Sequence, residues 1–195
     1  MTPGIETKEK IMNAAFELFS SRGYDRVSLN EVIAKAGVSK GGLFHYFDSK
    51  YSLGRDCLMR WADEHMAPGS VEEGSVELKP DEILIHFIDS MIELMVADSS
   101  LMKFFWSMFD EAMTNKKDLD IWIKFLEKYI SFVESAYRDL GVKDPRMKAM
   151  ILLSNLDGIT LYYSVLRDAD SNMDLKALRS ELIRTYVTFD EVIGK

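Results

Sequence analysis

The spacing of apolar residues along the chain predicts helices almost throughout. Near the N-terminus, apolar side chains recur every three or four positions, which is the period of one helix face. These residues are Ile11, Ala14, Ala15, Leu18 and Phe19. Short helices are predicted up to residue 65, and five longer ones follow at about 81–97, 100–114, 118–140, 145–168 and 174–192. No segment shows the alternation typical of a strand, so the predicted fold class is all-α.

Capping residues predict where the short helices begin and end. Ser28 and Glu31 have the spacing of a capping box, in which each side chain binds the backbone N–H of the other residue. Gly37 predicts the end of that helix. Ser39 predicts the start of a third helix, residues 40–46, and a fourth helix begins at about Ser49. Two short helices joined by such a tight turn have the layout of a helix-turn-helix.

The predicted helices divide the chain into a head and a bundle. Residues 1–48 form a three-helix helix-turn-helix domain, and residues 49–195 form a helical domain that begins with a connecting helix at 49–65. Residues 67–80 are predicted to be a loop. Residues 1–65 hold 9 basic and 9 acidic side chains, whereas residues 66–195 hold 15 basic and 23 acidic ones and carry the whole net charge of −8. Two units with different roles are therefore expected.

Composition narrows the class of protein. Of the 195 residues 47% are hydrophobic and 29% are charged, as in a soluble globular protein. The single cysteine, Cys57, excludes an intramolecular disulfide and favours a reducing, cytoplasmic location. The longest apolar stretch, residues 149–166, contains Ser154, Asn155 and Asp157, so no membrane-spanning helix and no membrane partner are expected.

The predicted third helix has an unusual exposed face. Lys40, Gly41, Phe44 and His45 lie together on it, and aromatic rings that face water need a partner surface. Glycine also costs about 1 kcal/mol relative to alanine inside a helix, a cost that makes sense where backbone must approach another surface closely. A DNA groove supplies such a surface. The alternative interpretation is a plain helical corner in a bundle.

The head resembles the DNA-binding domain of TetR/AcrR-family transcriptional regulators. The resemblance covers about residues 8–55 and rests on the runs Ala34–Gly41 and Leu43–Phe47 with Ser49-Lys50. It implies a homodimer that places one recognition helix in each half of a palindromic operator on double-stranded DNA. Carried over by position, the DNA-binding residues would be Ser28, Ser39, Lys40, Gly41, Phe44, His45, Tyr46 and Lys50. Phe44 stands where tyrosine is common, and Tyr51 stands where an acidic residue often completes the next cap.

Residues 81–135 are crowded with methionine and aromatic side chains. Such residues form bundle core in most proteins, but they also suit an adaptable apolar pocket. The resemblance implies a small-molecule effector site among these helices. The candidate residues are His86, Asp89, Met102, Phe105, Trp106, Phe109, Trp122, Phe125, Tyr129, Asn155 and Tyr163. His86 and Asp89 alone are too few to make a metal site, so neither a metal nor a cofactor is expected.

The last two predicted helices carry apolar stripes that predict a dimer interface. Small residues in the first stripe would allow two helices to approach closely, and two helices from each chain would form a four-helix bundle. The stripes comprise Met150, Ile151, Ser154, Gly158, Leu161, Tyr162, Val165, Leu178, Leu182 and Tyr186. The alternative is that the same stripes pack inside one chain.

These observations predict a ligand-responsive DNA-binding transcriptional regulator, most often a repressor in such families. The sequence has three histidines, and no arrangement of Ser, Cys, His and Asp matches a catalytic scaffold, so an enzyme is not expected. The alternatives are a helical protein-interaction module and a small-molecule- or lipid-binding bundle without DNA binding.

Overall fold

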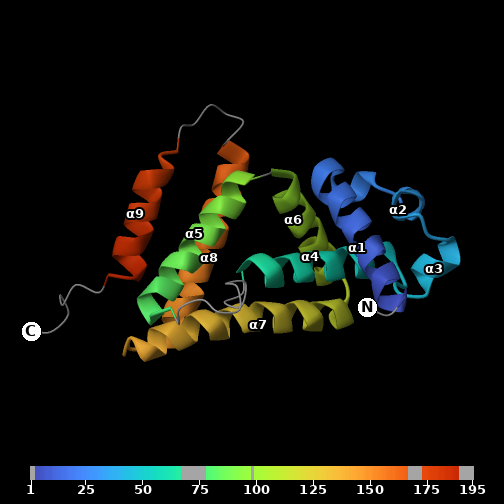
Figure 1. The fold of residues 1–195 in the computed structure, drawn as a ribbon. Coiled ribbons are helices and arrows are strands. Elements are labelled where there is room, and N and C mark those ends of the chain that lie inside the picture. The colour runs from blue at the N-terminus through green and yellow to red at the C-terminus, as the bar shows by residue number, and fades with distance from the viewer. Residues whose placement is uncertain (1–2, 67–77, 98, 167–172, 189–195) are drawn as a thin grey trace, which may run out of the picture. The chain divides into compact units, whose positions relative to one another are not determined.

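The computed structural model describes residues 3–66, 78–97, 99–166 and 173–188, and these residues form helices and no strand (Figure 1). The prediction of an all-α fold with an N-terminal helix-turn-helix and a helical C-terminal domain is confirmed. The elements are α1 (Pro3–Arg22), η1 (Tyr24–Arg26), α2 (Leu29–Ala36), α3 (Lys40–Phe44), α4 (Lys50–Met66), α5 (Pro80–Ala97), α6 (Ser99–Met113), α7 (Lys116–Asp139), α8 (Pro145–Leu166) and α9 (Leu175–Tyr186).

The chain forms two compact units. The first contains residues 1–64 and 98–123, and the second contains residues 65–97 and 124–195. The first unit thus holds α4, α6 and the beginning of α7 in addition to the three helices of the predicted head. The division between a DNA-binding domain, 1–48, and an effector and dimerisation domain, 49–195, stays a prediction about function.

Local signals set the ends of the short helices as predicted. Ser28 caps α2, with the Glu31 N–H donating to its hydroxyl at 3.3 Å and the Ser28 N–H donating to the Glu31 carboxylate at 2.8 Å. Gly23 and Gly37 end α1 and α2 at φ values of 87° and 65°, which side chains with a Cβ rarely adopt. The third helix is shorter than predicted and ends at Phe44.

The core of the first unit is built from α1, α3, α4 and α6. Phe19, Leu43 and Phe47 are fully buried in it. The ring of Phe104 on α6 packs on Phe19 and on Tyr24 of η1, at centroid distances of 5.3 and 5.9 Å. This aromatic packing holds α6 against α1 and η1.

The second unit has its own core from α5, α7, α8 and α9. Tyr137 is the largest fully buried side chain that α7 contributes to this unit, since Trp122 belongs to the first unit. The Tyr137 hydroxyl donates to the Tyr186 carbonyl at 3.0 Å. Arg179 of α9 binds both carboxylate oxygens of Asp89 on α5, at 2.6 and 2.8 Å. Residues 67–77 of the predicted loop and the predicted helical residues 189–192 lie outside the described residues.

One described helix, α8, is long and apolar enough to cross a membrane by length and composition alone. The sequence-based argument that Ser154, Asn155 and Asp157 make this segment too polar is therefore wrong as a matter of composition. Helices of soluble proteins pass the same test. Only 22% of the apolar window is buried within the described part of the chain.

Candidate nucleic-acid interface

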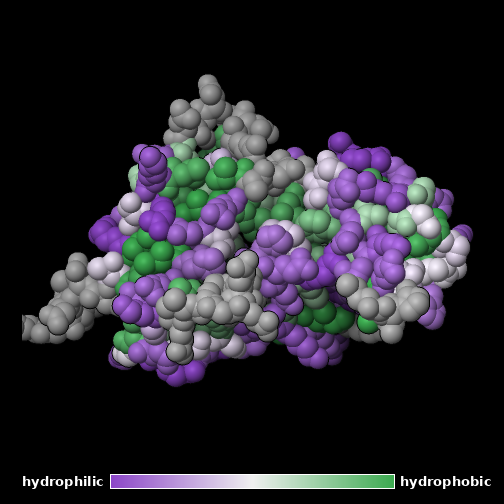
Figure 2. All heavy atoms as spheres, viewed as in Figure 1, coloured by the Kyte–Doolittle hydropathy of each residue, from purple (hydrophilic) through white to green (hydrophobic). Residues whose placement is uncertain are grey.

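Helix α3 is anchored on one face and exposed on the other. Ser39 caps it, with its hydroxyl accepting from the Gly42 N–H at 3.0 Å. Leu43 is buried in the head and fixes the rotation of the helix. Lys40 and Phe44 therefore point to solvent, and the Phe44 ring is 42% exposed. In Figure 2 the surface over α1, α2 and α3 mixes hydrophilic and hydrophobic residues.

The two glycines of α3 differ in what surrounds them. A Cβ at Gly42 would lie 3.3 Å from the Ser39 hydroxyl, so the cap itself favours a glycine there. A Cβ at Gly41 would meet only that hydroxyl, at 4.0 Å, and its backbone φ is not in the left-handed region. The described residues thus give no packing reason for glycine at position 41, where the exposed backbone is open to close approach from outside.

His45 and Tyr46 follow directly after α3. Their rings meet edge to face with centroids 4.8 Å apart, His45 exposed and Tyr46 half-buried. A Cβ at Gly4 would lie 3.3 Å from the Tyr46 hydroxyl, so this hydroxyl sits beside the start of α1. Tyr46 therefore contacts the start of α1 through its hydroxyl and His45 through its ring.

Ser28 is the predicted phosphate-binding serine, and its hydroxyl already donates to Glu31 at 2.8 Å. Hydrogen bonds from the Ser28 backbone and hydroxyl, together with Arg22 at 2.7 Å, lower the pKa of Glu31 to about 2. The start of α2 thus carries a carboxylate that neutralises the helix N-terminus. If Ser28 binds a phosphate, the phosphate and the Glu31 carboxylate must share its hydroxyl.

Lys50, the first residue of α4, lies against aromatic rings of the head. Its ammonium sits 4.2 Å from the centre of the Tyr24 ring and 5.9 Å from that of Phe19. Burial lowers the pKa of Lys50 from its ordinary value. The Tyr24 hydroxyl in turn donates to Glu111 of α6 at 3.1 Å, and burial raises the pKa of Tyr24. Tyr24 therefore connects α6 to a predicted DNA-contacting lysine, a connection that the sequence did not indicate.

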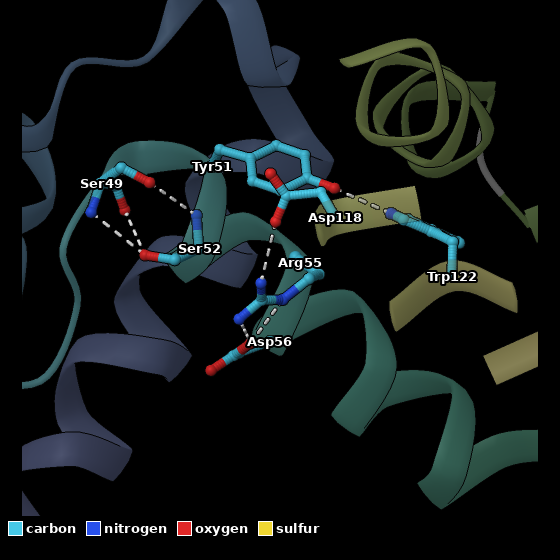
Figure 3. A network of polar contacts seen from close by, with 7 residues as sticks. All are labelled: Ser49, Tyr51, Ser52, Arg55, Asp56, Asp118 and Trp122. Atoms are coloured by element: carbon cyan, nitrogen blue, oxygen red, sulfur yellow. Dashed lines mark hydrogen bonds and ion pairs between the residues drawn. The ribbon is translucent and has the colours of Figure 1, made fainter. Parts of the chain in front are cut away.

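The start of α4 is capped by two serines (Figure 3). The Ser49 N–H donates to the Ser52 hydroxyl at 3.1 Å, and the Ser52 N–H donates to the Ser49 hydroxyl at 3.0 Å. Ser52 therefore makes the reciprocal hydrogen bond of the cap, which was expected of an acidic residue at position 51. Sequence reasoning missed this pair because it looked for a carboxylate, although serine can make the same reciprocal bonds.

Tyr51 connects α4 to α7 and does not cap α4. The Tyr51 hydroxyl accepts a hydrogen bond from the indole N–H of Trp122 on α7 at 2.9 Å (Figure 3). One turn further along α4, Arg55 binds Asp56 at 2.7 Å and reaches Asp118 of α7 at 3.4 Å. These contacts tie the first turns of α4 to the start of α7 within the first unit.

The structure divides the predicted effector residues between the two units. Met102, Phe105, Trp106, Phe109 and Trp122 belong to the first, and His86, Asp89, Phe125, Tyr129, Asn155 and Tyr163 belong to the second. Asp89 already pairs with Arg179, and the Asn155 amide donates to the Ile151 carbonyl at 2.9 Å. His86 is exposed. Of the four candidates expected to orient a ligand by polar contacts, His86, Asp89, Asn155 and Tyr163, Asp89 and Asn155 therefore already have partners in the chain.

In the first unit, four rings from α6 and α7 form a closed cluster. Neighbouring rings meet edge to face at 87–90°, with centroids 5.4–6.2 Å apart, and the members are Phe105, Trp106, Phe109 and Trp122. Among the described residues, the indole N–H of Trp106 is buried and has no hydrogen-bond acceptor. An unpaired buried donor costs about 1–3 kcal/mol, so its position needs an explanation.

The predicted dimer residues also fall into two groups. On α8, the apolar members Met150, Ile151, Leu161, Tyr162 and Val165 are all more than 40% exposed. Ser154 is exposed and Gly158 is half-buried beside them. On α9, Leu182 and Tyr186 are buried inside the second unit, and Leu178 is half-buried. The exposed apolar surface of this pair of helices is thus concentrated on α8.

Metal and thiol chemistry find little support in the described part of the chain. It contains no group of three His, Cys, Asp or Glu residues that could hold a metal ion. The Cys57 thiol is fully buried and donates to the Met12 carbonyl at 3.3 Å. Burial raises the pKa of this thiol to about 12, so it is a poor nucleophile at neutral pH.

Comparisons with known proteins agree with this geometry. A model of the bacterial regulatory proteins of the tetR family matches residues 11–56, which span α1 to the first half of α4. An uncharacterised HTH-type transcriptional regulator of Lactococcus lactis is 26% identical over 183 residues, which are 87% of this chain and 90% of that protein.

Solved structures share the whole fold. A transcriptional regulator from a Rhodococcus species superposes with a TM-score of 0.72 at 22% identity, covering 92% of this chain and 95% of its own. The regulator FadR from Bacillus subtilis, solved in complex with stearoyl-CoA, has a TM-score of 0.68 at 19% identity, covering 92% and 97%. At these identities the likeness establishes the fold.

Proposed function

Because this chain is a TetR-family, DNA-binding transcriptional regulator, we propose that it acts as a cytoplasmic homodimeric repressor, without enzymatic activity, on a palindromic operator. In this proposal a small, largely apolar effector releases the dimer from DNA. The observation that carries the proposal is the outer face of α3, where Lys40, Gly41 and Phe44 are exposed while Leu43 holds the helix in the head.

The chemistry of this face suits a duplex groove. Lys40 supplies a positive charge whose contact with a phosphate releases counterions. Phe44 can contact a thymine methyl, and His45 can donate to a guanine or a phosphate. We expect phosphate oxygens to accept hydrogen bonds from the Tyr46 hydroxyl and from the Ser39 hydroxyl, whose proton is not used by the cap. Ser28 and Lys50 complete the proposed contacts from the starts of α2 and α4.

The exposed stripe of α8 supports a dimer in which this helix meets its copy. Tyr162 and Val165 are 67% and 66% exposed, and so large an apolar surface is unusual on a helix that faces only water. Ser154 and Gly158 would let the two copies of the helix approach closely. Because Leu182 and Tyr186 are buried within the unit, the proposed interface rests mainly on α8.

The proposed effector acts by shifting a population between two arrangements of the dimer. Binding to consecutive major grooves requires the two recognition helices to lie about 34–36 Å apart. An effector that binds better to another spacing lowers the affinity for DNA by its difference in affinity for the two states. That FadR of Bacillus subtilis was solved with stearoyl-CoA supports an apolar effector on this fold.

Selection of bound sequences from random duplex DNA tests the proposal. We expect an inverted repeat whose half-sites are centred one helical turn apart, with binding that weakens steeply as salt rises. Recovery of no enriched sequence would contradict the proposal.

A further inference from the structure

The cluster formed by Phe105, Trp106, Phe109 and Trp122, here called the aromatic cluster, carries an unpaired polar group. Its rings come from α6 and from the start of α7 in the first unit. Both of its tryptophans have an indole N–H, but only that of Trp122 has an acceptor, the Tyr51 hydroxyl. Within the described residues the Trp106 Nε1 atom is buried with no acceptor.

The surroundings of this N–H define the chemistry of a ligand. Each ring contact in the aromatic cluster is apolar, so a ligand seated there must itself be largely apolar. An indole nitrogen can donate a hydrogen bond but cannot accept one, so the ligand must bring an acceptor. A carbonyl oxygen on a flat or aromatic skeleton satisfies both conditions.

The aromatic cluster extends from the interior of the first unit to its surface. Trp122 is fully buried, whereas Phe105, Trp106 and Phe109 each keep part of their surface exposed. The same face of α6 continues one turn further to Met113, whose side chain is 58% exposed. The apolar face thus runs from the buried ring of Trp122 to the surface.

From this geometry we infer that the aromatic cluster is the effector site and that Trp106 donates a hydrogen bond to a carbonyl oxygen of an apolar, aromatic effector. The inference rests on the proposed function, since it identifies the chemical class of the effector. The hydrogen bond from Trp122 to Tyr51 connects the site with α4 one residue after Lys50 (Figure 3). A shift of Trp122 on binding therefore acts on the start of α4.

Three matched pairs of probes test the ligand class on the full-length protein. They are acetophenone and ethylbenzene, benzophenone and diphenylmethane, and 1-acetonaphthone and 1-ethylnaphthalene. Within each pair only the carbonyl differs. We expect at least one ketone to bind about tenfold more tightly than its hydrocarbon partner, as one added hydrogen bond allows. In the Trp106→Phe variant the bound carbonyl has no donor, so the preference for the ketone should be abolished or reversed.

Nuclear magnetic resonance of the wild-type protein gives a readout that does not depend on that variant. The chain has three tryptophans, and hence three indole N–H signals. The ketone should move the Trp106 signal downfield, as expected for a new hydrogen bond, and its hydrocarbon partner should not. The inference is overturned if no ketone outbinds its partner, or if the bound ketone leaves the Trp106 signal in place.

The connection to α4 has its own test. Tyr51→Phe removes the acceptor of the Trp122 bond but keeps the ring, and the bound ketone should still move the Trp106 signal downfield, because that bond does not involve Tyr51. The weakening of operator binding by the ketone should shrink in this variant. An undiminished effect would show that the signal takes another route. Ketone binding is measured without DNA, so failure of the inference is distinguishable from failure of operator binding.

Discussion

Helices α3 and α8 both expose apolar side chains to solvent, but the chemistry around those side chains differs. On α3 a single ring, Phe44, stands beside a lysine, a glycine and a histidine. On α8 the exposed apolar residues follow one another over five turns, from Met147 to Val165. Exposed apolar surface alone therefore does not identify a partner. Its neighbours do: a mixed, locally basic face suits DNA, and a continuous apolar stripe suits a second copy of the same helix.

The largest expected effect comes from placing a charge in the α8 stripe. Val165→Glu should convert the dimer to a monomer, because each new carboxylate would be buried without a partner in an apolar interface. Operator affinity should fall by about 100-fold or more, since linked half-site binding is lost. Sedimentation and DNA titration measure the two effects.

Ile123→Glu is the matched control for the stripe. Ile123 is 52% exposed on α7, lies in the first unit and undergoes the same chemical change. It should leave the dimer intact. Equal dissociation of the two variants, or no dissociation of Val165→Glu, would remove the distinction between the stripe and any other exposed apolar residue.

Two helical glycines sharpen the comparison between surface and core. In Gly54→Ala the new Cβ would lie 2.9 Å from the Met108 sulfur and 3.1 Å from the Tyr24 ring. Such overpacking should lower the free energy of unfolding by about 1–3 kcal/mol. In Gly41→Ala the new Cβ would meet only the Ser39 hydroxyl, at 4.0 Å, and the change should raise this free energy by up to about 1 kcal/mol, because alanine favours helix.

For Gly41→Ala, operator affinity should change in the opposite sense to stability. Gly41→Ala should weaken DNA binding despite its greater stability, if the backbone at position 41 approaches the duplex. Thermal unfolding and DNA titration of one preparation give both quantities. Unchanged affinity in Gly41→Ala would mean that this backbone stays away from DNA.

Removal of a lysine from α3 should have a smaller effect on affinity but a specific one on its salt dependence. Lys40→Ala should reduce the slope of log affinity against log salt by about 1 per subunit. Lys35→Ala removes the same charge from α2, where Lys35 pairs with Glu17 at 2.6 Å, and should leave the slope nearly unchanged. Equal slopes for the two variants would contradict a phosphate contact by Lys40.

The smallest effect concerns the cap of α2. The pKa of Glu31 is about 2, below the ordinary 4.5, because the Ser28 backbone, the Ser28 hydroxyl and Arg22 all stabilise the carboxylate. Its contribution to stability is present above pH 4.5 and is lost as the pH falls through 2. Glu31→Gln should therefore be less stable than wild type at pH 7, with a difference that shrinks between pH 4.5 and 2 in chemical unfolding. A difference independent of pH would contradict this role.

Local features of the fold could be predicted from the sequence, because short-range bonds determine them. The capping box at Ser28 and the left-handed glycine at position 37 depend on residues within one turn. The serine pair at the start of α4 is equally local, but many residues can fill that role, so it was missed.

Contacts between distant helices could not be predicted, because periodicity shows which face is apolar but not which helix covers it. The bond from Tyr24 to Glu111 and the pair Asp89–Arg179 join residues about 90 positions apart. For the same reason the stripes of α8 and α9 looked alike in the sequence, while burial separates them. The residues proposed to contact DNA rest on the family resemblance and on their exposure, and DNA binding must test them.

Directed cleavage of DNA tests most directly whether α3 lies in the major groove. The only natural cysteine is buried with a thiol pKa of about 12, so an iron chelate can be attached selectively at a cysteine introduced by His45→Cys. The tethered iron should cut the operator at two symmetric positions about one helical turn apart. No cleavage of bound operator, or cuts no more localised than those from a chelate at Ser180→Cys on α9, would contradict the placement of α3 in the groove.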